Sequence, residues 1–293
     1  MKLGVIGGTG VYGIDGIEDL THEEVETPFG SPSDSYVCGK LDGREVVFLP
    51  RHGRGHRLLP SEINHRANIC GMKQLGVDRV LSISAVGSLR EEYRPRDIVL
   101  ADQYFDRTKE SAAHTFFGDG VVAHASLADP VCHDLAHCVR SAAEKVIQSR
   151  PEGDHVRVTR GGTYVQMQGP AFSTRAESNT YRGLGFDVIG MTSLGEAKLC
   201  REAELCYQPM CMVTDYDCWH ESEEAVTVEL VVAHLHANAA LAKDIVRQLI
   251  PELAESPPCG CSSAMAGSIL TQPDAVPADA RARLQPIIGR YLS

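Results

Sequence analysis

The sequence lacks the features of a membrane or exported protein. Its 293 residues contain no apolar run near the roughly 20 residues that a helix needs to cross a bilayer. The N-terminus begins directly with a strand-like apolar segment, Lys2–Ile6, rather than with a signal peptide. We therefore expect a cytoplasmic protein with no membrane partner.

The chain also lacks an excess of positive charge, internal repeats and low-complexity tracts. Its formal net charge is −11, which argues against a nucleic-acid partner and favours a small-molecule site with locally positive charge. Hydrophobic residues make up 43% of the sequence, and at this length they suffice for one large α/β core.

The ten cysteines do not have the setting of a disulfide framework, which belongs to short exported domains. Cys70 and Cys211 lie in apolar segments and are predicted to be small buried side chains. Cys259 and Cys261 stand in a polar tail, closer together than an ordinary zinc pair and without a following His. A local disulfide, a bridge to the body and free thiols remain open for this pair, which we expect to be exposed and reactive.

Strand-like and helix-like segments alternate along most of the chain. An apolar strand is expected at Val80–Ser84, a longer strand at Val156–Gln168, and helices at 129–148 and 226–249. This alternation predicts a single-domain layered α/β fold with a central mixed β-sheet flanked by helices.

The composition changes to Pro, Ser, Ala and Gly after Pro251. We therefore divide the chain into a main domain, residues 1–254, and a C-terminal extension, residues 255–293, packed on the same domain. A short helix is expected within the extension at Ala278–Leu284.

A glycine-rich loop follows the first strand, and Gly8–Gly13 matches G-x-G-x-x-G. A dinucleotide site would also need a helix directly afterwards and an acidic residue closing a second strand. Ile14–Leu20 is neither a good helix nor a good strand, and Asp34 has the right distance in the wrong context. A nucleotide-binding protein that uses only this loop is therefore the weaker alternative, although the loop and the Thr9 hydroxyl suit an anion.

Basic residues concentrate in one loop of this acidic chain. Pro50–Arg57 carries five of them, counting histidines, and Arg51 is suited to bidentate binding of phosphate. A solvated basic loop is the alternative. Ala85–Ser88, which we read as a small-residue turn after the strand at Val80–Ser84, offers further N–H and hydroxyl donors to the same anion.

Two carboxylates follow the apolar run Tyr207–Val213, which predicts a buried strand. Ligands of open α/β sheets bind beyond the carboxyl ends of the strands. Asp215 and Asp217 are two residues apart, so on an extended chain they share a face and raise each other's pKa. Such a pair could protonate a leaving group and accept from an amine. An ordinary turn is the alternative.

Several motifs occur in the order found in one enzyme family: Gly7–Gly10, Pro28–Asp34, Arg51–Arg54, Ser88–Glu92, Asp97–Val99, Glu177–Ser178, Met191–Thr192 and Thr214–Trp219. With these motifs the chain resembles the 5′-methylthioadenosine phosphorylases, which belong to the trimeric purine nucleoside phosphorylase family. The resemblance covers roughly residues 1–250 and leaves the tail outside it.

The resemblance implies phosphorolysis of a nucleoside. Phosphate, a co-substrate, attacks the anomeric carbon, adenine departs, and 5-methylthioribose 1-phosphate remains; no metal or organic cofactor is implied. A phosphorylase for 6-oxopurines or methylthioinosine is the alternative within the class, and it would need a donor such as Asn where Asp215 stands. The signature does not separate methylthioadenosine from adenosine.

The resemblance also implies roles for individual residues. Protonated Asp215 would lie near purine N7, while Asp217 would accept from the exocyclic amine. Phosphate contacts would come from six residues: Thr9, Arg51, His52, Ser84, where the family pattern has Thr, Ala85 and Thr192. Substrate contacts would come from Met191 under the ribose, Phe172 and Ser173 at the base, Val228 and Val231 around the methylthio group, and His124. Because His124 would serve a neighbouring subunit, we expect a homotrimer or a dimer of trimers.

Overall fold

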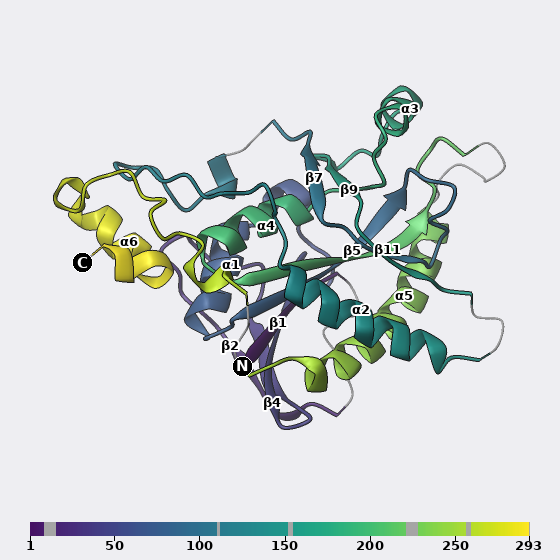
Figure 1. Cartoon of the computed structure of the whole chain (residues 1–293), viewed down its shortest axis with the longest axis horizontal. Helices are drawn as coiled ribbons and strands as arrows, with labels where there is room; N and C mark the ends of the chain where they lie inside the picture. Colours follow the sequence, from purple (N-terminus) through teal and green to yellow (C-terminus); the bar gives the residue numbers. More distant parts are fainter. Residues whose placement is uncertain (9–15, 110–111, 152–154, 221–227, 256–258, 293) are drawn as a thin grey trace.

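The structure, a computed structural model, describes the chain except residues 9–15, 110–111, 152–154, 221–227, 256–258 and 293 (Figure 1). For 228–233 it describes the backbone alone. The described strands are β1 (Lys2–Gly7), β2 (Glu18–Glu23), β3 (Tyr36–Leu41), β4 (Arg44–Pro50), β5 (Arg79–Ser88), β6 (Ile98–Leu100), β7 (Gln103–Asp106), β8 (Val158–Arg160), β9 (Thr163–Gln166), β10 (Val188–Gly190) and β11 (Cys206–Asp215). The helices are α1 (His65–Gln74), α2 (His133–Gln148), α3 (Arg175–Gly183), α4 (Ser193–Glu202), α5 (Val228–Leu249) and α6 (Ala278–Ile288).

These strands form one mixed sheet that branches at β5. Along the main path the order is β2-β3-β4-β1-β5-β10-β9-β7, while β11 also pairs with β5 and continues to β6 and β8. Within it, β4, β1, β5 and β11 are parallel neighbours. Their carboxyl ends therefore meet at one edge, which brings the segments after Gly7, Pro50 and Val213 together.

Helices cover both faces of the sheet (Figure 1). On one face α2 and α5 lie side by side and bury Leu135, Val139 and Ile245 against β1, β4 and β5. On the other face α1 and α4 pack together and bury further apolar side chains, Met72 and Leu199 among them. The mixed layered α/β fold predicted from the sequence is confirmed. None of the described helices has the length and apolarity needed to cross a membrane.

Two expectations for individual strands are wrong, and one strand was missed. The strand expected at Val156–Gln168 is two strands, β8 and β9, because Gly161 and Gly162 both take positive φ and break it. The segment expected to turn at Ala85–Ser88 instead continues β5, which pairs there with β11 and β10. β2 was missed because all of its residues are exposed and it has no apolar pattern.

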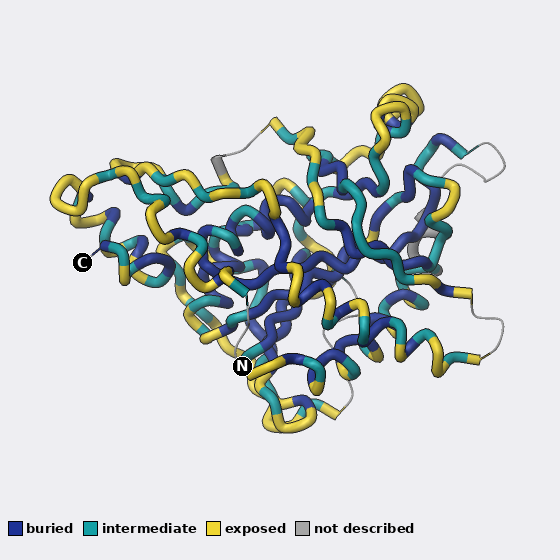
Figure 2. Tube along the Cα trace, viewed as in Figure 1, coloured by how far each residue is buried: buried dark blue, intermediate teal, exposed yellow. Residues whose placement is uncertain are grey.

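The C-terminal extension lies against the face of α1 and α4, and Figure 2 shows buried stretches within it. α6 begins at Ala278, as expected, but runs on to Ile288 and buries Leu284 and Ile287. Cys70 and Cys211 are buried, which confirms their expected role. The expectation of an exposed cysteine pair in the tail is wrong: Cys261 is buried, with 8% of its surface exposed, and Cys259 is half-buried.

Candidate active site

A cavity of about 380 Å³ opens at the carboxyl edge of β4, β1, β5 and β11. It receives most of the side chains expected from the sequence: Arg51, His52, Ser84, Ala85, Phe172, Met191, Thr192, Asp215 and Asp217. Thr9 lies outside the described residues, and so do the side chains of Val228 and Val231, which belong to the first turn of α5. The basic loop and the two carboxylates, more than 150 residues apart in the sequence, thus share one site.

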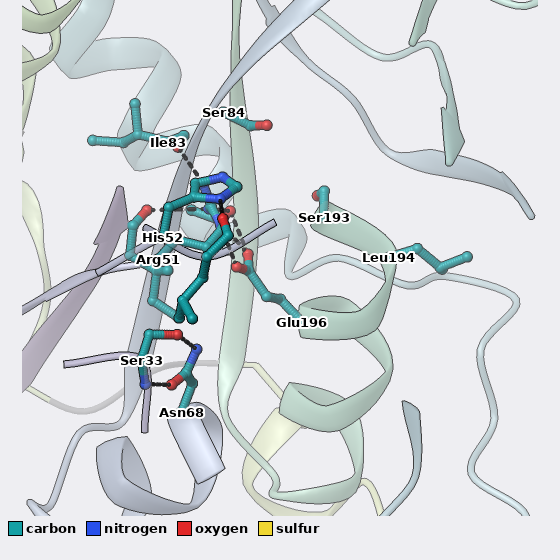
Figure 3. Close-up of polar contacts among 12 residues, drawn as sticks. Ser33, Arg51, His52, Asn68, Ile83, Ser84, Ser193, Leu194 and Glu196 are labelled. Carbon is teal, nitrogen blue, oxygen red and sulfur yellow. Dashed lines mark hydrogen bonds and ion pairs between the residues drawn. The ribbon is translucent and has the colours of Figure 1, made fainter. Parts of the chain in front are cut away.

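Arg51 is held inside the protein rather than projecting into open space (Figure 3). Its Nε lies 2.5 Å from Glu196 Oε1, and its Nη2 lies 2.7 Å from Ser82 Oγ. Nη1 donates to the Ile83 carbonyl at 3.0 Å, and the side chain is 2% exposed. The Glu196 carboxylate holds the pKa of buried Arg51 above its usual value despite the loss of solvent. Because Glu196 already takes its paired donors, free bidentate binding of phosphate by Arg51 is not the arrangement in this structure.

The hydroxyls near Arg51 keep capacity for an anion. Ser84 lies on β5, and its hydroxyl donates to the Ala85 carbonyl at a long 3.4 Å. Thr192 precedes α4, and its side chain makes no capping hydrogen bond there. Thr192, the N-cap residue of α4, thus lines the cavity together with Ser84, next to the partly positive end of the helix, where the Leu194 N–H already donates to Gln166 Oε1 at 3.1 Å.

His52 faces the same part of the cavity as a neutral ring. Burial lowers the pKa of His52 to about 4, and nearby Arg51 adds to this effect. Its Nδ1 lies 2.9 Å from the Leu58 carbonyl, which only accepts, so Nδ1 carries the proton. Nε2 is then left as an acceptor, which suits a protonated oxygen of phosphate.

The two carboxylates lie at the other side of the cavity, with Asp215 ending β11 after a bulge. Asp215 Oδ2 accepts from the Thr214 hydroxyl at 2.7 Å, and Oδ1 accepts from the Asp217 amide at 2.8 Å. Burial raises the pKa of Asp215. Burial likewise raises the pKa of Asp217 to about 6, and the neighbouring Asp215 carboxylate contributes to the increase. Asp217 Oδ2 is buried and receives no hydrogen bond from the described residues.

The close approach of these carboxylates to β5 requires a glycine. A Cβ added to Gly87 would lie 3.0 Å from Asp215 Oδ1 and 3.4 Å from the Cβ of Asp217. Asp217 itself has a φ of 52°, which turns the chain after β11. Asp215 and Asp217 were expected to share one face of an extended strand. Instead, a bulge before Asp215 and a left-handed turn at Asp217 bring both carboxyl groups to the cavity.

Apolar side chains form the remaining wall. Met191 follows β10, and a Cβ on Gly169 would meet its Sδ at 2.5 Å. Phe172 lines the cavity with 58% of its surface exposed, so it lies at the mouth rather than in the core. Ser173 does not line the cavity; its carbonyl accepts from the Cys218 thiol at 3.3 Å. An apolar wall of this kind suits the face of a flat ring.

His124 lies away from the cavity of its own chain. It is exposed, and its backbone N–H donates to the Ser268 carbonyl at 2.9 Å. Leu270 donates in turn to the Val122 carbonyl at 2.9 Å, so the C-terminal extension runs beside the loop that carries His124.

Sequence reasoning missed three residues that shape the site. Glu196 pairs with Arg51 across 145 positions, and no local pattern in the sequence indicates this pairing. Asn238 of α5 donates to the Val213 carbonyl at 3.1 Å and lines the cavity. The His234 ring, one turn earlier, lies 2.5 Å from the Thr214 carbonyl. Nothing in the helical pattern of α5 separates these two side chains from ordinary helix residues.

Comparison with protein families matches residues 2–251 of this chain to the model described as "Phosphorylase superfamily". The chain belongs to the phosphorylase superfamily. Its relatives include the S-methyl-5′-thioadenosine phosphorylases of Geobacter sulfurreducens, 53% identical over 99% of both chains, and of Koribacter versatilis, 54% identical over 99% of this chain and 96% of that one. These matches extend through the C-terminal extension, so the expectation that the tail lies outside the resemblance is wrong. As a member of this superfamily, the chain is an enzyme.

Solved structures agree with this assignment. A methylthioadenosine phosphorylase from an antarctic soil metagenomic library is 42% identical, with a TM-score of 0.90 and 98% of each chain covered. A variant of adenosine/methylthioadenosine phosphorylase from Schistosoma mansoni, in complex with methylthioadenosine, is 32% identical with a TM-score of 0.82. It covers 93% of this chain and 100% of its own.

Proposed function

We propose that this phosphorylase converts S-methyl-5′-thioadenosine and phosphate into adenine and 5-methylthioribose 1-phosphate. The observation that carries the proposal is the pair of carboxyl groups, Asp215 and Asp217, whose pKa values are raised at the cavity wall. The names of close relatives support the substrate.

The reaction passes through a sugar with oxocarbenium character, so the site must hold an anion on one face and neutralise the departing base. We assign phosphate to the end of the cavity that is lined by the Ser84 and Thr192 hydroxyls, next to the N-terminus of α4. A buried carboxyl group whose pKa is raised holds its proton more readily, and it can donate that proton to purine N7 as the glycosidic bond breaks. Asp215 takes this role and Asp217 accepts from the exocyclic amine, in keeping with the sequence expectation.

Arg51 receives a different role from the one expected. Its pairing with Glu196 fixes the loop after β4, so that His52 and the Ser84 segment keep their positions. It acts on phosphate through this placement, and through its remaining Nη1 hydrogen, rather than as a free bidentate clamp. No metal or organic cofactor takes part in the proposed chemistry.

We further propose a cytoplasmic homo-oligomer, a trimer or a dimer of trimers, acting in purine and methionine salvage. His124 supports the oligomer: it is exposed, its loop is held by the C-terminal extension, and it is separate from its own chain's cavity. In the assembly, His124 contacts the sugar in a neighbouring subunit. A fully active monomer, seen by light scattering at assay concentration, would rule this out.

The direct test is incubation of the purified protein with methylthioadenosine, adenosine and methylthioinosine, each with and without phosphate. We expect adenine release from methylthioadenosine only with phosphate, and little release of hypoxanthine from methylthioinosine. Faster cleavage of the oxopurine would instead support the 6-oxopurine alternative. Base release that does not depend on phosphate would refute phosphorolysis.

A further inference from the structure

Four cysteines from separate parts of the chain converge at one point. Their Sγ atoms, in Cys132, Cys206, Cys259 and Cys261, all lie within 4.8 Å of one another. Cys132 precedes α2, Cys206 begins β11, and the other two belong to the C-terminal extension. Thiols are weak hydrogen-bonding groups, so ordinary hydrogen bonding does not explain a convergence of this kind.

The spacing of these sulfurs fits a tetrahedral metal ion. With Zn–S bonds of about 2.3 Å, the edges of a tetrathiolate tetrahedron measure about 3.8 Å, so only small side-chain movements are needed. One pair, Cys206 Sγ and Cys259 Sγ, is 3.3 Å apart. In the sequence, Cys259 and Cys261 were too close together for an ordinary zinc pair. This spacing does not exclude a zinc site here, because Cys132 and Cys206 supply the other two ligands.

The surroundings favour thiolates bound to a cation. The Leu135 N–H lies 3.5 Å from Cys132 Sγ, the kind of second contact that orients a metal-bound thiolate. Cys132 also lies at the N-terminus of the 16-residue helix α2, where negative charge is stabilised. Cys132, Cys206 and Cys261 are buried among apolar side chains that limit water access.

We propose that Cys132, Cys206, Cys259 and Cys261 bind one zinc ion as a structural tetrathiolate site. The ion replaces the four thiol protons, and it fastens the C-terminal extension to the start of α2 and of β11. This site is distinct from the active site, because β11 runs for ten residues between Cys206 and Asp215, a distance of about 30 Å. With four protein ligands it keeps no open position, so it has no catalytic role.

The test uses the full chain, purified without chelators under reducing conditions, and measures its zinc by atomic emission. We expect about one zinc ion per chain, because a closed site takes four protein ligands. Cys261→Ser should lose most of this zinc. Cys138→Ser is the matched control: Cys138 also belongs to α2 but contacts the Glu252 carbonyl rather than the cluster, so this variant should retain its zinc.

Cobalt gives a second measurement that does not depend on a variant folding. Wild-type protein stripped of metal and reloaded with Co²⁺ should show the intense thiolate-to-cobalt absorption and the visible bands of a tetrahedral site. A chelator should lower the Tm of wild type and of Cys138→Ser, but not of Cys261→Ser. The proposal is overturned if the wild-type protein contains no zinc and, after reduction, gives no cobalt bands. This holds both when its cysteines are free thiols as purified and when they are paired as disulfides.

Discussion

At one end of the cavity the charge of Arg51 is paired inside the protein with Glu196, whereas at the other end Asp217 has a buried oxygen that receives no hydrogen bond from the residues that the structure describes. At the proposed phosphate end the charge of Arg51 is thus paired before any ligand arrives, while the hydroxyls of Ser84 and Thr192 keep capacity for an anion. At the proposed base end burial raises the pKa values of both carboxyl groups. We infer from this contrast that the phosphate end holds its ligand in position and that the carboxyl groups of the base end carry out the proton transfer.

The largest effect should come from the base end. Asp215→Asn removes the proton donor to N7, and loss of a general acid typically costs about 100- to 10,000-fold in rate. The amide can still donate to a 6-oxo group, so methylthioinosine cleavage should fall less or rise. The measurement is kcat/KM for both substrates at saturating phosphate.

Asp217→Asn is the comparison for that variant, because it should weaken binding of the amine without helping oxopurines as much. If Asp215→Asn cleaves methylthioadenosine nearly as fast as wild type, Asp215 is only a turn residue and the contrast between the two ends is wrong.

At the phosphate end, Glu196→Gln should act first on stability. It leaves the Arg51 guanidinium charged and buried without its partner, and breaking such a pair typically costs about 3 to 5 kcal/mol. Denaturant unfolding at fixed protein concentration measures the loss.

Glu202→Gln is a matched control on the same helix. Burial raises the pKa of Glu202 to about 7, so its carboxyl group is about half protonated at neutral pH, and among the described residues it has no paired cation like Arg51. The replacement should lower the free energy of unfolding by about 1 kcal/mol, because the amide accepts more weakly from the Thr115 hydroxyl and the Phe116 N–H. Equal losses of unfolding free energy in the two variants would show that the ion pair of Arg51 with Glu196 does not contribute more to stability than the hydrogen bonds of Glu202.

A smaller effect is expected from Ser84. Ser84→Ala removes one hydroxyl donor to phosphate, and a hydrogen bond to a charged group contributes about 1.5 to 3 kcal/mol, or at least tenfold in affinity. The KM for phosphate should rise by about that factor, while the KM for methylthioadenosine changes little. Ser84→Thr keeps the hydroxyl and should behave like wild type; a Thr variant as weak as the Ala variant would exclude the hydroxyl as a phosphate ligand.

The smallest effect should be the pH dependence of the base end. Asp217 has a pKa of about 6, so it gains a proton as the pH falls through that value and then no longer accepts from the amine with both oxygens. We expect kcat/KM for methylthioadenosine to fall below about pH 6, with apparent pKa values that belong to the carboxyl pair. Asp217→Asn should remove this limb. An unchanged limb in that variant would assign it to another group.

The sequence was most informative where the relevant groups are neighbours in the chain. The run Tyr207–Val213 followed by Asp215 and Asp217 predicted a strand end with two carboxylates, and the structure places both in the cavity. The basic loop at Pro50–Arg57 likewise predicted the polar edge, although the pairing of Arg51 was not foreseen.

Groups separated in the chain could not be predicted. Glu196 meets Arg51 across 145 positions, and no local pattern indicates a partner at that distance. The cysteine cluster combines residues of α2, β11 and the extension, so Cys259 and Cys261 alone appeared as an exposed pair. β2, exposed throughout, has no apolar period to detect. In each case the determining contact is tertiary, and local spacing does not encode it.

The pairing of Leu270 and Ser268 with the loop of Val122 and His124 has a consequence for biosynthesis. The chain emerges from the ribosome N-terminus first, and early segments of a protein begin to fold during synthesis. Here the loop that carries His124 lacks these partners until Ser268 and Leu270 have been translated. A chain cut short before these residues would therefore contain every described strand of the sheet but would leave this loop unsupported.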